Sequence, residues 1–353
     1  MKHPLAWQGA AVLLLLGACA PVTQRPPLDE KVVAEEARRQ RELALEDLLE
    51  DQARLHRIAY PILARGAPLC GEKVRPALGA RFAGRDDFGR ELREAAERRL
   101  GVADEAVVVH VAAGSPAERA GLRERDVVVA VAGNPAPRGE GAARRLVEAI
   151  AQAEKSGAPL ALRVRRAGLE LDLAATPEPA CDYAVLLHPE HVPNAFADGR
   201  RILLTRGMLR FAREDLELAV VIGHELAHNA MGHIAKRAGN MLLGTILDIL
   251  AASRGVNTQG AFGELAGLAY SQAFEAEADY VGLYFVARAG HDVARAPNIW
   301  RRIAAAAPGS IARQGFLATH PSTPERFVAL ERTVEEIRAK QAAGAELVPE
   351  LRR

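Results

Sequence analysis

The 353-residue chain lacks several features that would define other classes of protein. Lys and Arg number 46 and Asp and Glu 45, so no excess of positive charge indicates a nucleic-acid partner. Three cysteines are too few for a four-cysteine zinc ribbon or a disulfide-dense miniprotein. The apolar run over residues 241–252 is interrupted by Asp248 and is shorter than the about 20 residues that a membrane-spanning helix needs.

Aromatic residues make up only 5% of the sequence, so the core must consist mainly of Ala, Leu and Val. The sequence contains neither a glycine-rich phosphate-binding loop nor a Gly-x-Ser-x-Gly nucleophile motif. The remaining composition, 49% hydrophobic and 26% charged, is typical of a globular protein with a sizeable core. The length favours two domains and a helical extension.

The first 28 residues have the pattern of an export signal followed by a tether. Lys2 precedes a short apolar run, residues 10–16, which is too short for a permanent membrane helix. The small residues before Cys19 resemble a bacterial lipoprotein cleavage box. That resemblance implies removal of residues 1–18, a lipid on Cys19 and anchoring at the periplasmic face of an outer membrane. An ordinary signal peptide with an incidental cysteine is the alternative. Residues 19–28, with three prolines, predict a tether.

Two cysteines, Cys70 and Cys181, remain in the mature protein and would meet an oxidising compartment. Disulfides form and persist in such compartments. We therefore expect a disulfide between Cys70 and Cys181, with two separate thiols as the alternative.

Residues 29–65 predict a long amphipathic helix. Apolar residues recur at helical spacing among many charged ones, and residues 29–60 contain no Gly or Pro. The helical pattern ends near Pro61. Such a helix could be a solvated spacer or could bind a partner, and its pattern does not decide between the two.

Residues 76–176 predict a small β-sandwich capped by helices. Strand-like runs at 107–111 and 126–131 are followed by a helical segment at 141–154 and two further strands. The segment from Gly114 to Gly133, which begins Gly-Ser-Pro-Ala-Glu-Arg-Ala-Gly-Leu, resembles the core of a bacterial PDZ domain. The resemblance implies that the domain binds extended peptides or protein C-termini along a sheet edge. A spacer or lid is the alternative, and the long segment 84–101 leaves the carboxylate-binding loop unplaced.

Residues 181–340 form a helix-rich unit around the sequence His224-Glu225-Leu226-Ala227-His228. The apolar residues before this motif predict a helix, on which residues four apart share a face. Two neutral imidazoles at that spacing can bind one zinc ion, while Glu225 is offset and can polarise a zinc-bound water. His233 would lie about 140° from the ligand face of a continuous helix, so we interpret it as structural.

A catalytic zinc site needs a third protein ligand, and residues 270–279 predict a helix that carries candidates. Glu275 and Asp279 are four residues apart and share a face, whereas Glu277 is offset by about 200° and is predicted to point elsewhere. One of the two carboxylates could bind zinc, and the other could accept the N–H of a ligating histidine. The spacing leaves these two roles open.

Several of these motifs together resemble the HtpX and CAAX-prenyl-endopeptidase family of zinc metallopeptidases, in its soluble, BepA-like envelope branch. The resemblance rests on HELAH, Ser271, the Glu-x-x-Ala-Asp segment, Thr319-His320-Pro321-Ser322 and Arg326. It implies a zincin domain of the gluzincin type that holds one zinc ion per molecule. It assigns His224, His228 and Glu275 as zinc ligands, Glu225 as general base and Asp279 as the partner of a ligand.

The segment from Pro193 to Leu209 also resembles that family, in which it forms the substrate-side edge strand. This likeness implies that Asn194, Ala195 and Phe196 contact the substrate, because a free strand edge offers unpaired N–H and C=O groups to an extended peptide. His320 has three interpretations: a donor to the tetrahedral oxyanion, a fourth ligand that blocks the open zinc position, or a structural histidine.

These observations predict an α+β, lipid-anchored zinc endopeptidase of the bacterial envelope. Its substrates would be misfolded or misassembled envelope proteins, which the PDZ-like domain would select. The alternative is an envelope-assembly chaperone or binding protein whose zinc site is latent or structural. A PDZ adaptor with an inactive peptidase fold is a third option, which the intact HELAH and Glu-x-x-Ala-Asp motifs disfavour. No nucleic-acid partner is expected.

Overall fold

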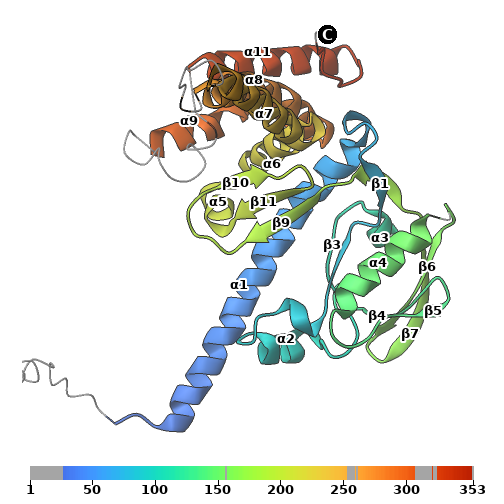
Figure 1. The fold of residues 1–353 in the computed structure, drawn as a ribbon. Coiled ribbons are helices and arrows are strands. Elements are labelled where there is room, and N and C mark those ends of the chain that lie inside the picture. Colours follow the sequence, from blue (N-terminus) through green and yellow to red (C-terminus); the bar gives the residue numbers. More distant parts are fainter. Residues whose placement is uncertain are drawn as a thin grey trace, which may run out of the picture.

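The computed structural model describes residues 27–155, 157–252, 259, 261–306, 320 and 324–351. The predicted signal segment, the lipidation site Cys19 and residues 20–26 lie outside this range. Figure 1 shows a long helix, α1, that runs from an N-terminal end projecting away from the domains into a helix-rich C-terminal domain, with a sheet domain beside it. The protein combines helices and sheets, so the predicted α+β class is confirmed. None of the described helices combines the length and apolar character needed to cross a membrane.

Helix α1 spans Glu30–Arg65 and is capped by Asp29, whose side chain accepts a hydrogen bond from the Lys31 N–H. The helix continues through Pro61, beyond the end that its sequence pattern predicts. A proline removes one N–H donor from a helix. Here it lies in the last turns of the helix, which still close through the Gly66 N–H and the Ile62 carbonyl at 3.0 Å.

The C-terminal half of α1 is part of the C-terminal domain's core and not a solvated spacer. Leu55, Ile58 and Ile62 are buried in the same cluster as Leu218 and Phe285. Burial of such side chains is worth about 1.5–3 kcal/mol each, so this half of α1 is fixed by packing.

The sheet domain is one six-stranded antiparallel sheet with helices packed on it. Its strands run in the order β2-β3-β4-β6-β7, and the short β5 pairs with β4. The buried side chains between the sheet and the helices include Val108, Val128, Leu146 and Leu162. The strands are β2 (Ala80–Ala83), β3 (Val107–Val111), β4 (Val127–Val131), β5 (Asn134–Pro135), β6 (Leu160–Arg166) and β7 (Leu169–Ala175), and the helices are α2 (Arg93–Leu100), α3 (Pro116–Arg119) and α4 (Ala142–Glu154).

The long segment 84–101 connects the sheet domain to α1. It contains a short 3-10 helix, η2 (Arg85–Asp87), and α2. Phe88, Ala95 and Ala96 pack with Leu45 of α1 in one buried cluster. The additional residues in this segment therefore form a contact between the sheet domain and the helix.

A two-stranded sheet forms where the backbone enters and leaves the sheet domain. The backbone enters through β1 (Val74–Ala77), which follows the 3-10 helix η1 (Ala67–Leu69), and leaves through β8 (Glu178–Cys181). The two strands pair antiparallel, and a disulfide joins Cys181, the last residue of β8, to Cys70, which lies between η1 and β1. The structure thus contains the disulfide that the sequence predicts.

The C-terminal domain begins with a three-stranded sheet in the order β10-β11-β9. Strand β9 (Ala184–His188) is parallel to β11 (Arg201–Thr205), and β10 (Ala195–Ala197) pairs antiparallel with β11 as an outer strand. Helices follow and build the rest of the domain: α5 (Arg206–Phe211), α6 (Asp215–Ala230), α7 (His233–Ala252), α8 (Ala261–Arg288), the 3-10 helix η3 (Val293–Arg295), α9 (Pro297–Ala306) and α11 (Pro324–Ala342).

Helices α6 and α8 approach closely at two glycines, Gly223 and Gly282. A Cβ atom placed on Gly223 would lie 2.7 Å from the Gly282 carbonyl oxygen. A Cβ atom on Gly282 would lie 3.0 Å from the Cα atom of His224. Only glycine permits this backbone contact, which brings the HELAH helix against the helix that carries Glu275.

We expect Gly223→Ala to lower the free energy of unfolding by roughly 1–3 kcal/mol, because the added methyl group meets backbone atoms that cannot move aside. Urea unfolding measures the loss. The matched control is Gly239→Ala, since Gly239 is also helical but an added methyl group there would have no atom within 4 Å. Alanine there should be neutral or stabilising by up to about 1 kcal/mol. Equal effects of the two substitutions would contradict the close-packing argument.

Replacing both Cys70 and Cys181 by Ser should lower the free energy of unfolding by up to about 4–5 kcal/mol. The cross-link spans 111 positions, and a loop of that length strongly restricts the unfolded protein in the entropic model. The measurement compares the denaturation midpoints of the oxidised protein and the double variant. Coincident midpoints would show that the disulfide does not stabilise the fold.

Candidate metal centre

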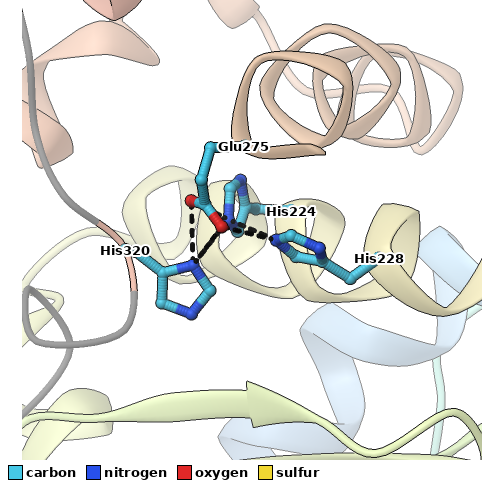
Figure 2. A group of neighbouring side chains, drawn as sticks. All are labelled: His224, His228, Glu275 and His320. Atoms are coloured by element: carbon cyan, nitrogen blue, oxygen red, sulfur yellow. Dashed lines mark hydrogen bonds and ion pairs between the residues drawn. The ribbon is translucent and has the colours of Figure 1, made fainter. Parts of the chain in front are cut away.

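Four buried side chains converge between α6 and α8. His224 and His228 come from α6, Glu275 comes from α8 and His320 comes from the segment before α11. Figure 2 shows the Glu275 carboxylate directed at the three imidazole rings. One ligand atom from each of the four residues lies within 4.8 Å of all the others. The helix crossing at Gly223 and Gly282 therefore assembles a group of metal-ligand side chains.

Three of these side chains have the spacing of zinc ligands. The Nε2 atoms of His224 and His228 lie 3.1 Å apart, and oxygens of Glu275 lie 3.3 and 3.2 Å from them. A tetrahedral zinc ion with bonds of about 2.0–2.1 Å separates its ligands by about 3.3 Å. The two nitrogens and the carboxylate thus already form one face of such a tetrahedron.

Asp279 fixes the ring of His224 from behind. Its Oδ1 lies 3.0 Å from His224 Nδ1, so the opposite nitrogen, Nε2, faces the centre. Arg326 anchors Asp279 with two hydrogen bonds, from Nε at 2.7 Å and from Nη2 at 2.8 Å. The spacing of Glu275 and Asp279 left their roles open, and the structure places Glu275 at the ligand position and Asp279 behind a ligand.

The charges of the centre favour a bound cation. Burial would raise the pKa of Glu275, but hydrogen bonds from the surrounding histidines hold it far below its usual range. Burial also disfavours a charged His224, yet Asp279 and Glu275 outweigh it and raise the pKa of this ring to about 9. The ring therefore accepts positive charge, and the carboxylates that stabilise it would stabilise a metal ion in the same way.

Glu225 gives the strongest indication that the site takes a ligand. Its side chain is only 1% exposed, and neither carboxylate oxygen has a hydrogen-bond partner among the residues that the structure describes. The nearest charged contact is His320 Nε2 at 3.4 Å. Burying a carboxylate without partners is costly. Two imidazoles, one carboxylate and a buried Glu225 whose oxygens accept no hydrogen bond from the described residues fit a zinc ion with its water.

His320 lies inside the centre. Its Nδ1 is 3.2 Å from His224 Nε2 and 2.9 Å from a Glu275 oxygen, and its other nitrogen faces Glu225. The ring is thus placed either to bind the metal or to donate a proton beside it. A purely structural role does not account for this position.

Two residues that the sequence did not connect to the centre, His233 and Glu277, lie behind His228. His233 Nδ1 lies 3.0 Å from His228 Nδ1, and His233 Nε2 lies 2.7 Å from Glu277 Oε2. The helical angle used for His233 is wrong because α6 ends at Ala230 and Gly232, with φ of +68°, turns the backbone before α7. The glycine after the HELAH helix was the available signal for that break. Burial lowers the pKa of His233 to about 4, so its ring is neutral.

The predicted substrate strand lies next to the centre, with one side chain facing it. Phe196, on the outer strand β10, lines a cavity of about 150 Å³ together with Glu225 and His228. Ala195 is fully buried, and the Asn194 N–H donates to Thr205 Oγ1 within the hairpin. Of the three predicted contacts, the structure brings only the Phe196 side chain to the cavity.

Asn229, which no sequence pattern indicated, positions this hairpin. Its Oδ1 accepts a hydrogen bond from the Gly199 N–H at 2.7 Å, and its Nδ2 donates to the Arg201 carbonyl at 3.0 Å. Because Asn229 follows His228 directly, the HELAH helix itself holds the β10–β11 turn.

The sheet domain has a narrow groove along its outer strand. Residues 79–82 of the turn and β2 form one wall, and Val147, Ile150 and Glu154 of α4 form the opposite one. Helix α1 closes a further side with His56 and Tyr60, and the enclosed volume is about 200 Å³.

The paired imidazoles, the carboxylate and the buried glutamate define a zinc metallopeptidase centre. Comparison with known families agrees: residues 161–334 match Peptidase family M48, and residues 107–156 match the PDZ domain family. The protein therefore contains an M48 metallopeptidase domain and a PDZ domain, which confirms the resemblance to zinc metallopeptidases and the resemblance to PDZ domains. M48 peptidases depend on zinc, and the cluster of His224, His228, Glu275 and His320 could bind it. The M48 match begins within β6, so its first residues lie in the PDZ sheet.

Two curated relatives and one solved structure illustrate the similarity. The mitochondrial metalloendopeptidase OMA1 of Arabidopsis thaliana is 34% identical over 149 residues, 41% of this chain and 30% of the relative. The beta-barrel assembly-enhancing protease of Yersinia pestis is 27% identical over 169 residues, 43% of this chain and 35% of the relative. The HtrA3 PDZ domain bound to a phage-derived ligand is 27% identical, covering 30% of this chain and 88% of that one, with a TM-score of 0.23.

The chain thus spans about a third of the length of each of these two curated relatives. The similarity identifies the kind of domain that the two relatives share with this protein.

Proposed function

We propose that this protein is a zinc-dependent endopeptidase that cleaves unfolded or misassembled proteins of the bacterial cell envelope. The observation that carries the proposal is the buried carboxylate of Glu225, which accepts no hydrogen bond from the described residues, beside the cluster of His224, His228 and Glu275. The M48 domain and the metalloendopeptidase relatives support the reaction. The name of the Yersinia relative supports a role in the envelope, as does the lipoprotein-like sequence at Cys19.

The residues of the centre would have separate roles in peptide hydrolysis. Bound zinc supplies a Lewis acid that polarises the scissile carbonyl and makes water more acidic. A carboxylate oxygen of Glu225 takes the proton of the attacking water and then delivers it to the leaving amine. Asp279, held by Arg326, keeps His224 Nε2 directed at the centre. The free edge of β10 would hold the substrate extended beside Phe196.

The PDZ domain would select substrates by adding an extended peptide or a C-terminus to β2. Strand β2 is an outer strand of its sheet, as strand addition requires. The groove of about 200 Å³ is smaller than the roughly 300–1,000 Å³ of common ligand sites. Because His56 and Tyr60 of α1 line the same groove, we expect peptide binding to shift the sheet domain relative to α1.

A second candidate function is a chaperone-like or binding role in envelope assembly with a latent zinc centre. The position of His320 favours it, because Nδ1 lies at ligand spacing from His224 and Glu275. A fourth protein ligand would close the position that a catalytic zinc site keeps open for water.

Glu225→Gln should leave zinc content at one ion per molecule and lower cleavage of unfolded casein by at least about 100-fold, since Gln cannot accept the water proton. Cleavage by fluorescent peptide release and metal content by atomic absorption give the two readouts. Glu335→Gln, at an exposed position on α11, is the matched control and should cleave normally. Normal turnover by a zinc-loaded Glu225→Gln protein would exclude Glu225 as the general base.

If His320 closes the open ligand position, as the second candidate function holds, His320→Ala should raise casein cleavage several-fold. The same assay measures it, with zinc content determined in parallel. Reduced cleavage at unchanged zinc content would contradict the blocking role and indicate that His320 stabilises the oxyanion.

A further inference from the structure

The hydrolytic scheme leaves two side chains of the centre without a role, His233 and Glu277. His233 is 2% exposed and lies at the start of α7. Its ring stacks on Phe274 of α8, with ring centres 4.5 Å apart and planes inclined by 15°. Glu277, on the same helix as Phe274, reaches the far nitrogen of His233. This placement joins both residues to the zinc ligand His228.

The distances determine which nitrogen of each ring carries a proton. His228 presents Nε2 to the centre, 3.2 Å from Glu275 Oε1, so as a neutral ligand it carries its proton on Nδ1. That nitrogen faces His233 Nδ1 at 3.0 Å. His233 Nδ1 must then accept, which puts the His233 proton on Nε2. Nε2 donates to Glu277 Oε2 at 2.7 Å. His228 therefore donates a hydrogen bond to His233, and His233 donates one to Glu277.

We propose that His233 and Glu277 are positioning residues for zinc. His233 accepts the Nδ1 proton of His228, and Glu277 holds His233 in the tautomer that can accept it. His228 is thereby kept with the lone pair of Nε2 aimed at the metal. The proposal rests on the zinc binding of the proposed function, and it concerns the affinity of the centre and not the proton transfer by Glu225.

The two zinc-binding histidines, His224 and His228, differ in how a carboxylate orients the ring. His224 contacts the carboxylate of Asp279 directly, and Arg326 fixes that carboxylate. His228 reaches a carboxylate only through the ring of His233. The Glu277 side chain is 31% exposed, so water can partly replace it, whereas nothing can replace the buried ring. Loss of His233 should therefore weaken zinc binding more than loss of the Glu277 charge.

The test measures zinc affinity of the full-length protein by competition with a chromophoric chelator, after removal of metal. Loss of an outer hydrogen-bond partner of a ligand commonly costs 10–100-fold in metal affinity. We expect His233→Ala to raise the zinc Kd about 10–100-fold and Glu277→Gln to raise it several-fold. His233→Gln should restore much of the affinity, because its amide oxygen can accept from His228 and its NH₂ can donate to Glu277.

His291→Ala is the matched control, since it removes a half-buried histidine that lies after α8 and away from the centre. Its zinc Kd should equal that of the unmodified protein. Thermal unfolding of the zinc-free variants and the visible spectrum of cobalt-loaded protein are recorded alongside. A positioning role moves the Kd and the cobalt spectrum, whereas a packing role moves only the unfolding temperature.

The outcomes separate this proposal from the function on which it rests. If the unmodified protein binds no zinc, the proposed function and this proposal both fail. If the unmodified protein binds one zinc and all three variants match its Kd, only the role of His233 and Glu277 is overturned. If His233→Ala does not fold, Glu277→Gln carries the test, and an unchanged Kd in that variant overturns the proposal.

Discussion

The close crossing of α6 and α8 at Gly223 and Gly282 is the constraint on which the centre depends. From this contact the two helices run antiparallel. His224 therefore pairs with Asp279, and one turn further along His228 meets Glu275. A larger side chain at either glycine would separate the helices and widen the distances between all four groups. The metal centre is thus a consequence of two missing side chains as much as of the ligands themselves.

The surrounding parts of the molecule hold this helix pair and place the β10–β11 hairpin beside it. The C-terminal half of α1 packs beneath the pair through Leu55 and Ile58. Asn229 ties the end of the HELAH helix to the hairpin that carries Phe196. The PDZ domain joins through β1, β8 and the disulfide, and its groove faces α1. Helix α1 therefore packs in the core around the helix pair and also lines the groove beside β2.

The sequence predicted what lies within one helix and missed what depends on turns or distant segments. His224, Glu225 and His228 follow from spacing, because one α-helix fixes their relative directions. The same rule failed for His233, since the turn at Gly232 ends that helix. Spacing could not assign the separate roles of Glu275 and Asp279, which depend on how α8 crosses α6. The amphipathic pattern of α1 could not reveal that its apolar face completes the core of a distant domain.

The central claim is that His224, His228 and Glu275 bind zinc between α6 and α8. The most direct measurement is an anomalous difference map from crystals of the zinc-loaded protein, with data collected on both sides of the zinc absorption edge. We predict one peak per molecule, at bonding distance from both histidine Nε2 atoms and the Glu275 carboxylate. A peak elsewhere, or no peak in crystals of active protein, would contradict the account.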